Sequence, residues 1–187
     1  MRISRLSDSS IDYLYFPEPP KRNVDGWGAY TRYYKLDETQ GLKLGHNTRY
    51  TVTDLAMYSI LRRVFPKYGI QIPKIYGLAV VAKCQRVKSW HDSPNGLLFG
   101  YIVEHITYVP KYDNADETLC EKVERIARAN GLNAWDVGSP NTTTTPKNYL
   151  IDVNSIRPGT AKMYEEVNAL KEKITSAFQL IASNEKA

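Results

Sequence analysis

The chain has 187 residues, of which 42% are hydrophobic and 24% charged, and its formal net charge at pH 7 is +5. These values are ordinary for a soluble globular protein, and the length suffices for one good core or two small lobes. The basic residues are scattered, with no run of Lys or Arg longer than two, so attraction to polyanions is permitted but not required.

Neither the cysteines nor the histidines have the spacing of metal ligands, so we expect no zinc site. Cys84 and Cys120 are far apart, and two free thiols in a reducing cytosol are the default expectation. No apolar segment follows the basic N-terminus, and the longest apolar run, residues 78–82, is too short to span a membrane. We therefore expect a cytoplasmic protein without membrane contact.

The predicted elements begin with an irregular, proline-containing arm over residues 1–24, with a short strand at 13–16. From there the periodicity predicts, in order, a strand pair at 29–36 and 42–44, a helix at 51–68, a strand pair at 75–83 and 97–106, a helix at 116–130 stopped by Gly131, a loop and strand over 132–152, and a helix at 161–182. Because paired strands are adjacent in sequence, we expect an antiparallel sheet in an α+β protein.

The sequence leaves open which residue caps the first helix and what the last helix packs against. Thr51 or Thr53 is expected to cap the first helix, and Asp54 to lie in its first turn, where an acid stabilises a helix N-terminus. The last helix carries an apolar stripe close to a heptad seam. That stripe predicts packing on the protein's own core or, as the alternative, a dimer contact through the C-terminal helix.

The pattern that most directly suggests chemistry is Asp136, then Asn141, then Asp152 at the end of a short apolar strand. Protein kinases use this spacing for a carboxylate that orients the attacking hydroxyl and for oxygen ligands that hold Mg²⁺ against ATP. Asp136 is the candidate catalytic carboxylate, and Asn141 and Asp152 are the candidate metal ligands. The alternative is a polar turn whose acids are solvated or cap a helix.

The element order together with this motif resembles the protein-kinase fold in a reduced form, with similarity to the small early kinase of T7-like podophages. The resemblance implies an antiparallel sheet N-lobe over residues 25–110 and a truncated helical C-lobe over 111–187. It implies a nucleotide site in which Gly26 and Gly28 stand in the glycine-rich loop. Lys43 stands as the phosphate-binding strand lysine, and Glu104 at the end of the strand that leads to the adenine-binding segment.

Several positions depart from the kinase pattern. Ala134-Trp135 replaces His-Arg before the candidate catalytic Asp, and Val153-Asn154 replaces Phe-Gly after the metal-binding Asp. These departures keep a second hypothesis open, in which a degenerate kinase-like protein binds and modulates a host protein in the host cytoplasm.

A third hypothesis is nucleic-acid binding. It rests on the pI of about 9.1 and on a tyrosine-rich strand with basic neighbours. The candidate patch consists of Tyr30, Tyr33, Tyr34, Arg32 and Lys35. The alternative is an ordinary strand whose side chains alternate between two faces.

Overall fold

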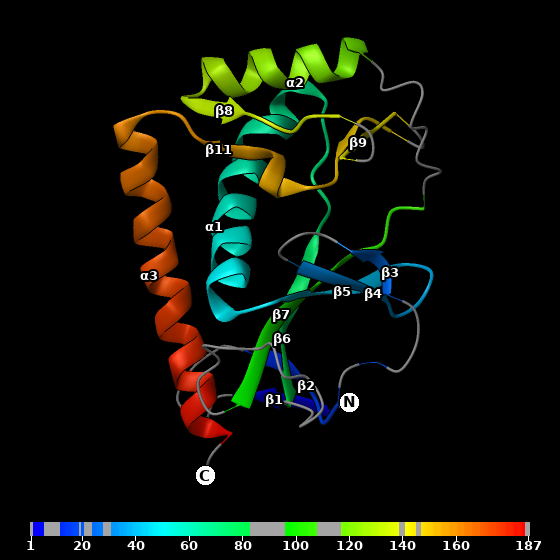
Figure 1. Ribbon diagram of the computed structural model, residues 1–187, viewed down its shortest axis with the longest axis vertical. Helices are drawn as coiled ribbons and strands as arrows, with labels where there is room; N and C mark the ends of the chain where they lie inside the picture. The colour runs from blue at the N-terminus through cyan, green and yellow to red at the C-terminus, as the bar shows by residue number, and fades with distance from the viewer. Residues whose placement is uncertain are drawn as a thin grey trace. The chain divides into compact units, whose positions relative to one another are not determined.

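The computed structural model describes residues 2–5, 12–18, 20, 24–27, 31–82, 96–107, 117–138, 141–144 and 147–185. These residues form an α+β protein, as the sequence predicts (Figure 1). In chain order the elements are β1 (Arg2–Arg5), β2 (Asp12–Phe16), β3 (Val24–Trp27), β4 (Thr31–Lys35), β5 (Gln40–Gly45), α1 (Thr48–Val64), the 3-10 helix η1 (Phe65–Tyr68), β6 (Ile75–Ala82), β7 (Leu97–Glu104), α2 (Glu117–Ala129), β8 (Leu132–Ala134), β9 (Thr142–Thr143), β10 (Tyr149–Leu150), the 3-10 helix η3 (Val153–Ser155), β11 (Ile156–Pro158) and α3 (Ala161–Asn184).

The main sheet is mixed and has the strand order β1-β2-β6-β7-β5-β4-β3. The two predicted hairpins, β4–β5 and β6–β7, are confirmed as antiparallel pairs. The expectation of a wholly antiparallel sheet is wrong, because β2 runs parallel to β6, with Tyr13 opposite Leu78. Three strands and α1 lie between β2 and β6 in the chain, and a connection of that length allows parallel pairing.

The first 24 residues contribute two strands to this sheet. The short strand expected at 13–16 is confirmed as β2, and β1 pairs with it antiparallel. The expectation of an irregular arm is therefore wrong for both segments. Their backbone groups find partners in the sheet, which an isolated arm could not provide.

One face of the sheet buries an apolar cluster. Leu42 and Leu44, two residues apart on β5, are both fully buried, as the period-2 alternation of a strand requires. The cluster consists of Phe16, Tyr34, Leu42, Leu44, Ala79, Val81, Leu98 and Ile102. Lys43 lies between the two leucines and therefore faces the opposite side of the sheet.

Helix α1 begins earlier than the sequence suggests. It starts at Thr48, and the side chain of Asn47 accepts a hydrogen bond from the Tyr50 backbone N–H (3.1 Å), which makes Asn47 the capping residue. The expected caps, Thr51 and Thr53, lie inside the helix. The buried Thr51 hydroxyl instead donates to the Phe99 carbonyl of β7 (2.6 Å), which fixes the first turns of α1 to the sheet.

The chain divides into two compact units. The first comprises residues 1–53, 74–105 and 173–187, and the second comprises residues 54–73 and 106–172. The second unit has a core of its own, to which η1, α2 and the short strands contribute. Its buried apolar residues include Phe65, Ile70, Ile72, Leu119, Val123, Ile126, Leu132, Leu150, Val153, Ile156 and Val167.

The two later helices follow the sequence closely. Gly131 takes a left-handed conformation (φ 71°) just after α2, as its predicted role as a helix stop requires. On α3, Val167, Phe178 and Ile181 of the apolar stripe are buried within the chain, and Phe178 stacks on Phe99 with ring centroids 4.4 Å apart. This burial favours packing on the chain's own core. None of the helices in the described part of the chain is both long and apolar enough to span a membrane.

We expect Gly100→Ala to destabilise the protein, because a Cβ at Gly100 would overlap the backbone carbonyl oxygen of Lys43 on the neighbouring β5. Forcing two central strands apart is expected to cost about 1–3 kcal/mol of unfolding free energy, measured by urea denaturation. The matched control is Gly77→Ala on β6, where a Cβ would meet no atom within 4 Å. Equal unfolding midpoints for the two variants would contradict this account of β5–β7 packing.

Candidate functional site

The second unit brings Asp136 and Asn141 together. The Asn141 side-chain amide donates to the backbone carbonyl of Asp136 (2.8 Å), and the Asn141 backbone N–H donates to the carbonyl of Gly138 (2.6 Å). The Thr142 N–H also donates to Gly138 (3.0 Å). These bonds fix the loop that carries Asp136 to the start of β9.

The same asparagine reaches the third predicted residue through its backbone. The Asn141 carbonyl accepts hydrogen bonds from the N–H groups of Ile151 (2.8 Å) and Asp152 (3.4 Å). These bonds continue the β9–β10 pairing, in which Leu150 lies opposite Thr142. The structure therefore places Asp136, Asn141 and Asp152 around one hydrogen-bonded junction of the second unit.

Asp152 also has a capping role. One of its carboxylate oxygens, Oδ1, accepts from the backbone N–H of Asn154 (3.1 Å) and from the Asn154 side-chain amide (3.3 Å), at the start of η3. The alternative interpretation of Asp152 as a helix cap therefore describes part of its environment. The hydrogen bonds of this cap both go to Oδ1.

The oxygen atoms that this junction offers are of the kind that binds a hard cation such as Mg²⁺. The side-chain nitrogen of Asn141 is used as a donor to Asp136, which leaves the amide oxygen as its potential ligand atom. Together with the carboxylate of Asp152 it would supply the oxygen ligands that Mg²⁺ prefers. No group of three His, Cys, Asp or Glu side chains in the described part of the chain forms a metal cluster by protein ligands alone.

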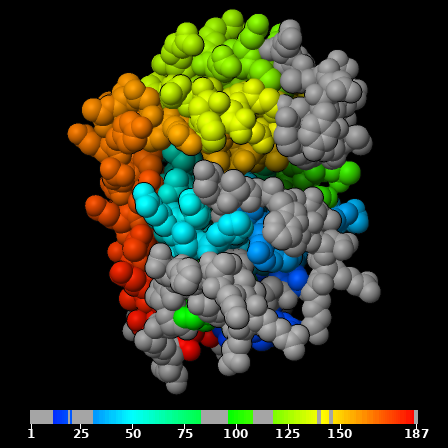
Figure 2. Space-filling model, in the orientation of Figure 1, coloured from blue at the N-terminus to red at the C-terminus, as the bar shows by residue number. Residues whose placement is uncertain are grey.

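Asp136 itself is exposed, and so is the neighbouring Trp135. Figure 2 shows the segment around β8, coloured yellow, forming part of the visible surface. An exposed carboxylate can be reached by an acceptor molecule, whereas a buried carboxylate that caps a helix cannot.

In the first unit, Lys43 occupies the middle of β5. It lies opposite Tyr33 on β4 and opposite Tyr101 on β7, and it is half-buried. The backbone of Lys43 is thus held on both sides within the sheet. The backbone of a lysine on a central strand is more firmly positioned than that of a lysine on an exposed edge strand.

Glu104, the other polar candidate of this unit, ends β7. Its Oε2 accepts from the Lys74 backbone N–H (3.0 Å), while its own N–H donates to the Lys74 carbonyl (2.8 Å). The side chain therefore closes the open end of the β6–β7 pair. Gly26 lies within β3 opposite Tyr33, where the strand register shifts, and Gly28 is outside the described residues.

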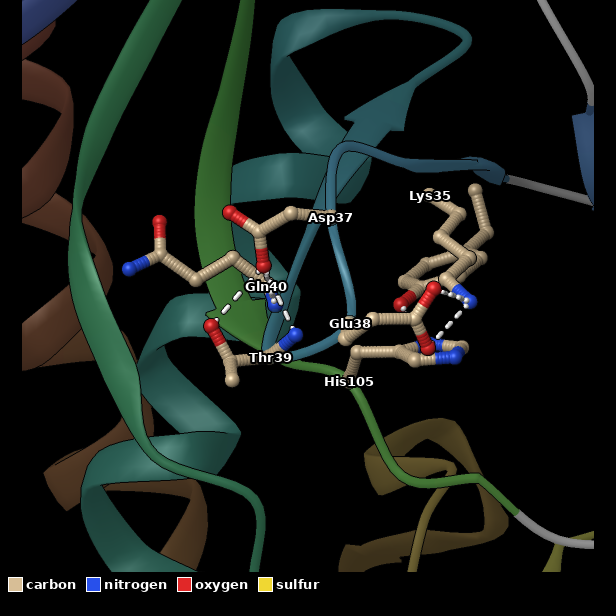
Figure 3. Close-up of polar contacts among 7 residues, drawn as sticks. Lys35, Asp37, Glu38, Thr39, Gln40 and His105 are labelled. Carbon is tan, nitrogen blue, oxygen red and sulfur yellow. Dashed lines mark hydrogen bonds and ion pairs between the residues drawn. The ribbon is translucent and has the colours of Figure 1, made fainter.

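The turn between β4 and β5 lies beside the end of β7 (Figure 3). Asp37 accepts three hydrogen bonds there, from the backbone N–H (2.7 Å) and hydroxyl (2.8 Å) of Thr39 and from the backbone N–H of Gln40 (2.8 Å). The bonds from Thr39 are the main reason that the pKa of Asp37 is lowered from its ordinary value. The His105 backbone N–H donates to the Thr39 carbonyl (2.8 Å), so the turn and the residue after Glu104 are held together.

A Tyr33–His105 pair, which the sequence analysis missed, lies beside this turn. The Tyr33 hydroxyl is 2.6 Å from His105 Nδ1, and the two rings stack with centroids 5.9 Å apart. The Tyr33 ring fills the space that a side chain at Gly41 would need. The one signal in the sequence is Gly41, because a residue without a side chain leaves room for the ring of Tyr33.

The tyrosine-rich patch of the nucleic-acid hypothesis is divided by the sheet. Tyr34 is buried in the apolar cluster, whereas Tyr33 faces the other side and contacts His105. Tyr30 lies outside the described residues. The interpretation of these tyrosines as one exposed patch is therefore wrong, because neighbouring residues of a strand point to opposite faces.

A buried acid on α1 was also misinterpreted. Because α1 starts at Thr48, Asp54 lies beyond its first turn, and its side chain is only 1% exposed. It follows Thr51 by three residues and so lies on nearly the same face of the helix. A buried carboxylate requires a polar or charged partner, so Asp54 is held by the protein interior and does not act as a solvated charge at the helix terminus.

Comparisons with known proteins do not assign the chain to a family. No protein-family model, no curated protein and no solved structure matches it.

We expect Asn141→Ala to loosen the junction around Asp136, because the variant loses the side-chain bond but keeps the backbone carbonyl. The expected cost is about 0.5–1.5 kcal/mol, with faster hydrogen exchange at the amides of Asn141 and Thr142. The control is Asn133→Ala, which alters an exposed asparagine of β8 in the same unit. Unchanged exchange at both amides would show that the side-chain bond does not hold the loop.

A pH effect is expected from His46, in the turn between β5 and α1. Burial, and then the positive charge of Arg32, lower the pKa of His46 from 6.5. Below about pH 6.5 the unfolded chain binds this proton more readily than the folded protein does. The free energy of unfolding should therefore fall as the pH drops from 7 to 5, and should fall less in His46→Gln. Urea unfolding at each pH provides the measurement, and equal slopes for both proteins would contradict the assignment.

Proposed function

We propose that the protein is a kinase-like phosphotransferase that binds ATP with Mg²⁺ and transfers the γ-phosphoryl group to a protein serine or threonine hydroxyl. The observation that carries the proposal is the junction formed by Asn141, which bonds to the carbonyl of Asp136 and accepts from the N–H of Asp152. The spacing alone is a weak signal, but its three residues also lie in one local hydrogen-bonded unit. Proximity of the three residues along the backbone is one condition that a catalytic carboxylate and two metal ligands must meet.

In the second unit, different residues would bind the metal and accept the proton. Asn141 and Asp152 would hold Mg²⁺, which would supply positive charge to neutralise the transferred phosphoryl group. Asp136 would orient the acceptor hydroxyl. The hydroxyl oxygen forms a bond to the γ-phosphorus, the bond from that phosphorus to the bridging oxygen of ADP breaks, and the hydroxyl proton passes to Asp136.

The first unit supports the nucleotide side of the proposal. Counted from the strand that contains Gly26, Lys43 lies on the third strand, which is where protein kinases carry the phosphate-binding lysine. Gly26 and Gly28 would approach the phosphates through their backbone, and Glu104 marks the strand end beyond which adenine would bind.

A second candidate is a kinase-like protein that binds a host protein without catalysis. The capping of η3 by Asp152 favours it, because a carboxylate committed to the backbone is a weaker metal ligand. The position of Trp135 directly before Asp136, where kinases carry arginine, favours it as well.

We expect Mg²⁺-ATP to raise the melting temperature of the protein. A ligand at a hundredfold excess over its Kd stabilises the folded state by about 2.7 kcal/mol, which corresponds to about 5–10 °C for a chain of this size. The shift should require the metal, and it should disappear in Asp152→Asn and in Lys43→Ala. Thermal unfolding followed by circular dichroism measures it.

The matched variant is Asp136→Asn, since Asp136 is assigned to the acceptor. It should keep the Mg²⁺-ATP shift but lose about 10²–10⁴-fold in transfer of labelled phosphate to protein hydroxyls. A full shift in Asp152→Asn would refute the metal assignment. No shift in the wild-type protein at millimolar ATP would refute the enzyme and favour the partner-binding candidate.

A further inference from the structure

Trp135 is exposed yet held in place. Its side chain is 47% exposed, although exposure of so large an apolar group is unfavourable. Its backbone N–H donates to the Ser155 carbonyl (3.0 Å), and its indole N–H donates to the Asn154 carbonyl. The guanidinium carbon of Arg157 lies 3.9 Å from the ring centroid. Three separate contacts therefore hold Trp135, the residue that precedes Asp136 in the chain.

The pairing of β8 with β11 explains how this arrangement forms. Arg157 lies opposite Asn133, and Trp135 follows Asn133 by two residues, so Trp135 and Arg157 are diagonal neighbours on one face. Diagonal positions of a strand pair are within reach of long and aromatic side chains. The four residues that carry the contacts all belong to the second unit.

The exposed group of this pair is a cation. Arg157 is exposed, and no carboxylate among the residues that the structure describes forms an ion pair with it. A guanidinium whose carbon lies over an aromatic ring can still donate from its N–H groups, whose geometry fits a carboxylate or a phosphate. The stacking also reduces the number of orientations that Arg157 must lose on binding.

We propose that Trp135 and Arg157 form the acceptor-binding site of this protein and bind an anionic side chain of a peptide, a carboxylate or a phosphate, close to the hydroxyl that Asp136 orients. This inference rests on the proposed function and adds the class of acceptor to it: an acidic peptide. A nucleic acid is less well matched, because stacking of bases needs open aromatic faces and Arg157 covers one face of the indole.

Binding of short fluorescent peptides, measured by anisotropy without nucleotide, tests the inference. The peptides share a central serine, flanked by glutamates in one, by a phosphoserine in the second and by alanines in the third. We expect the wild-type protein to bind at least one anionic peptide about tenfold or more tightly than the alanine peptide. Arg157→Gln should remove this preference, and Arg157→Lys should restore it only in part. The anionic peptide that binds more tightly identifies whether the site prefers a carboxylate or a phosphate.

The matched control is Arg125→Gln, which removes an exposed arginine from α2 of the same unit. It should keep the preference for anionic peptides. Equal losses in Arg157→Gln and Arg125→Gln would show a general charge effect and overturn the proposal. So would equal binding of all three peptides by the wild-type protein, or tighter binding of an oligouridylate than of any peptide.

A separate readout distinguishes failure of this inference from failure of the proposed function. Arg157→Gln should keep the Mg²⁺-ATP shift in melting temperature, because neither Trp135 nor Arg157 is assigned to the nucleotide. Loss of that shift in Arg157→Gln would mean that the pair supports the nucleotide site or the fold, and would overturn its role in acceptor binding. A normal shift without anionic preference would overturn the acceptor site and leave the phosphotransferase intact.

Discussion

The close approach of β5 to both of its neighbours is the constraint on which the first unit depends. Strand β5 pairs with β4 on one edge and with β7 on the other. Glycines at two positions make the approach feasible: Gly41 leaves room for the ring of Tyr33, and Gly100 leaves room for the carbonyl of Lys43. With both edges paired, the backbone of Lys43 cannot move independently of the sheet, so the base of its side chain has a fixed position. Its neighbours Leu42 and Leu44 are buried on the opposite face.

In the second unit, a single asparagine has the corresponding role. Asn141 uses its side chain to hold the loop before it and its carbonyl to hold the strand after it. A side chain with both a donor and an acceptor can stabilise a loop and still present an oxygen, which neither Asp nor Ala could do in the same way. The spacing from Asp136 to Asn141 thus allows a side-chain bond from Asn141 to the Asp136 carbonyl, beside the backbone bonds to Gly138. This gives the motif a structural cause in addition to its proposed chemistry.

Two surfaces of the second unit then acquire related roles. The Asn141 junction offers oxygen ligands, while Arg157 offers a cation that is held over the indole of Trp135, the residue before Asp136. Metal and acceptor charge would be recognised by different residues around one carboxylate. Such a division allows the acceptor preference to change without altering the metal ligands.

The sequence by itself determined the local elements: the two hairpins, the helix that stops at Gly131, the long last helix, and the Asp136–Asn141–Asp152 motif. These depend on periodicity and turn chemistry within short windows. Only the tertiary structure decided the parallel pairing of β2 with β6, the start of α1 at Thr48 and the separation of Tyr33 from its buried neighbour. It alone decided the stacking of Arg157 on the indole. Each of these depends on a hydrogen bond or a buried contact between segments distant in the chain, and no local pattern specifies which distant partner will be met.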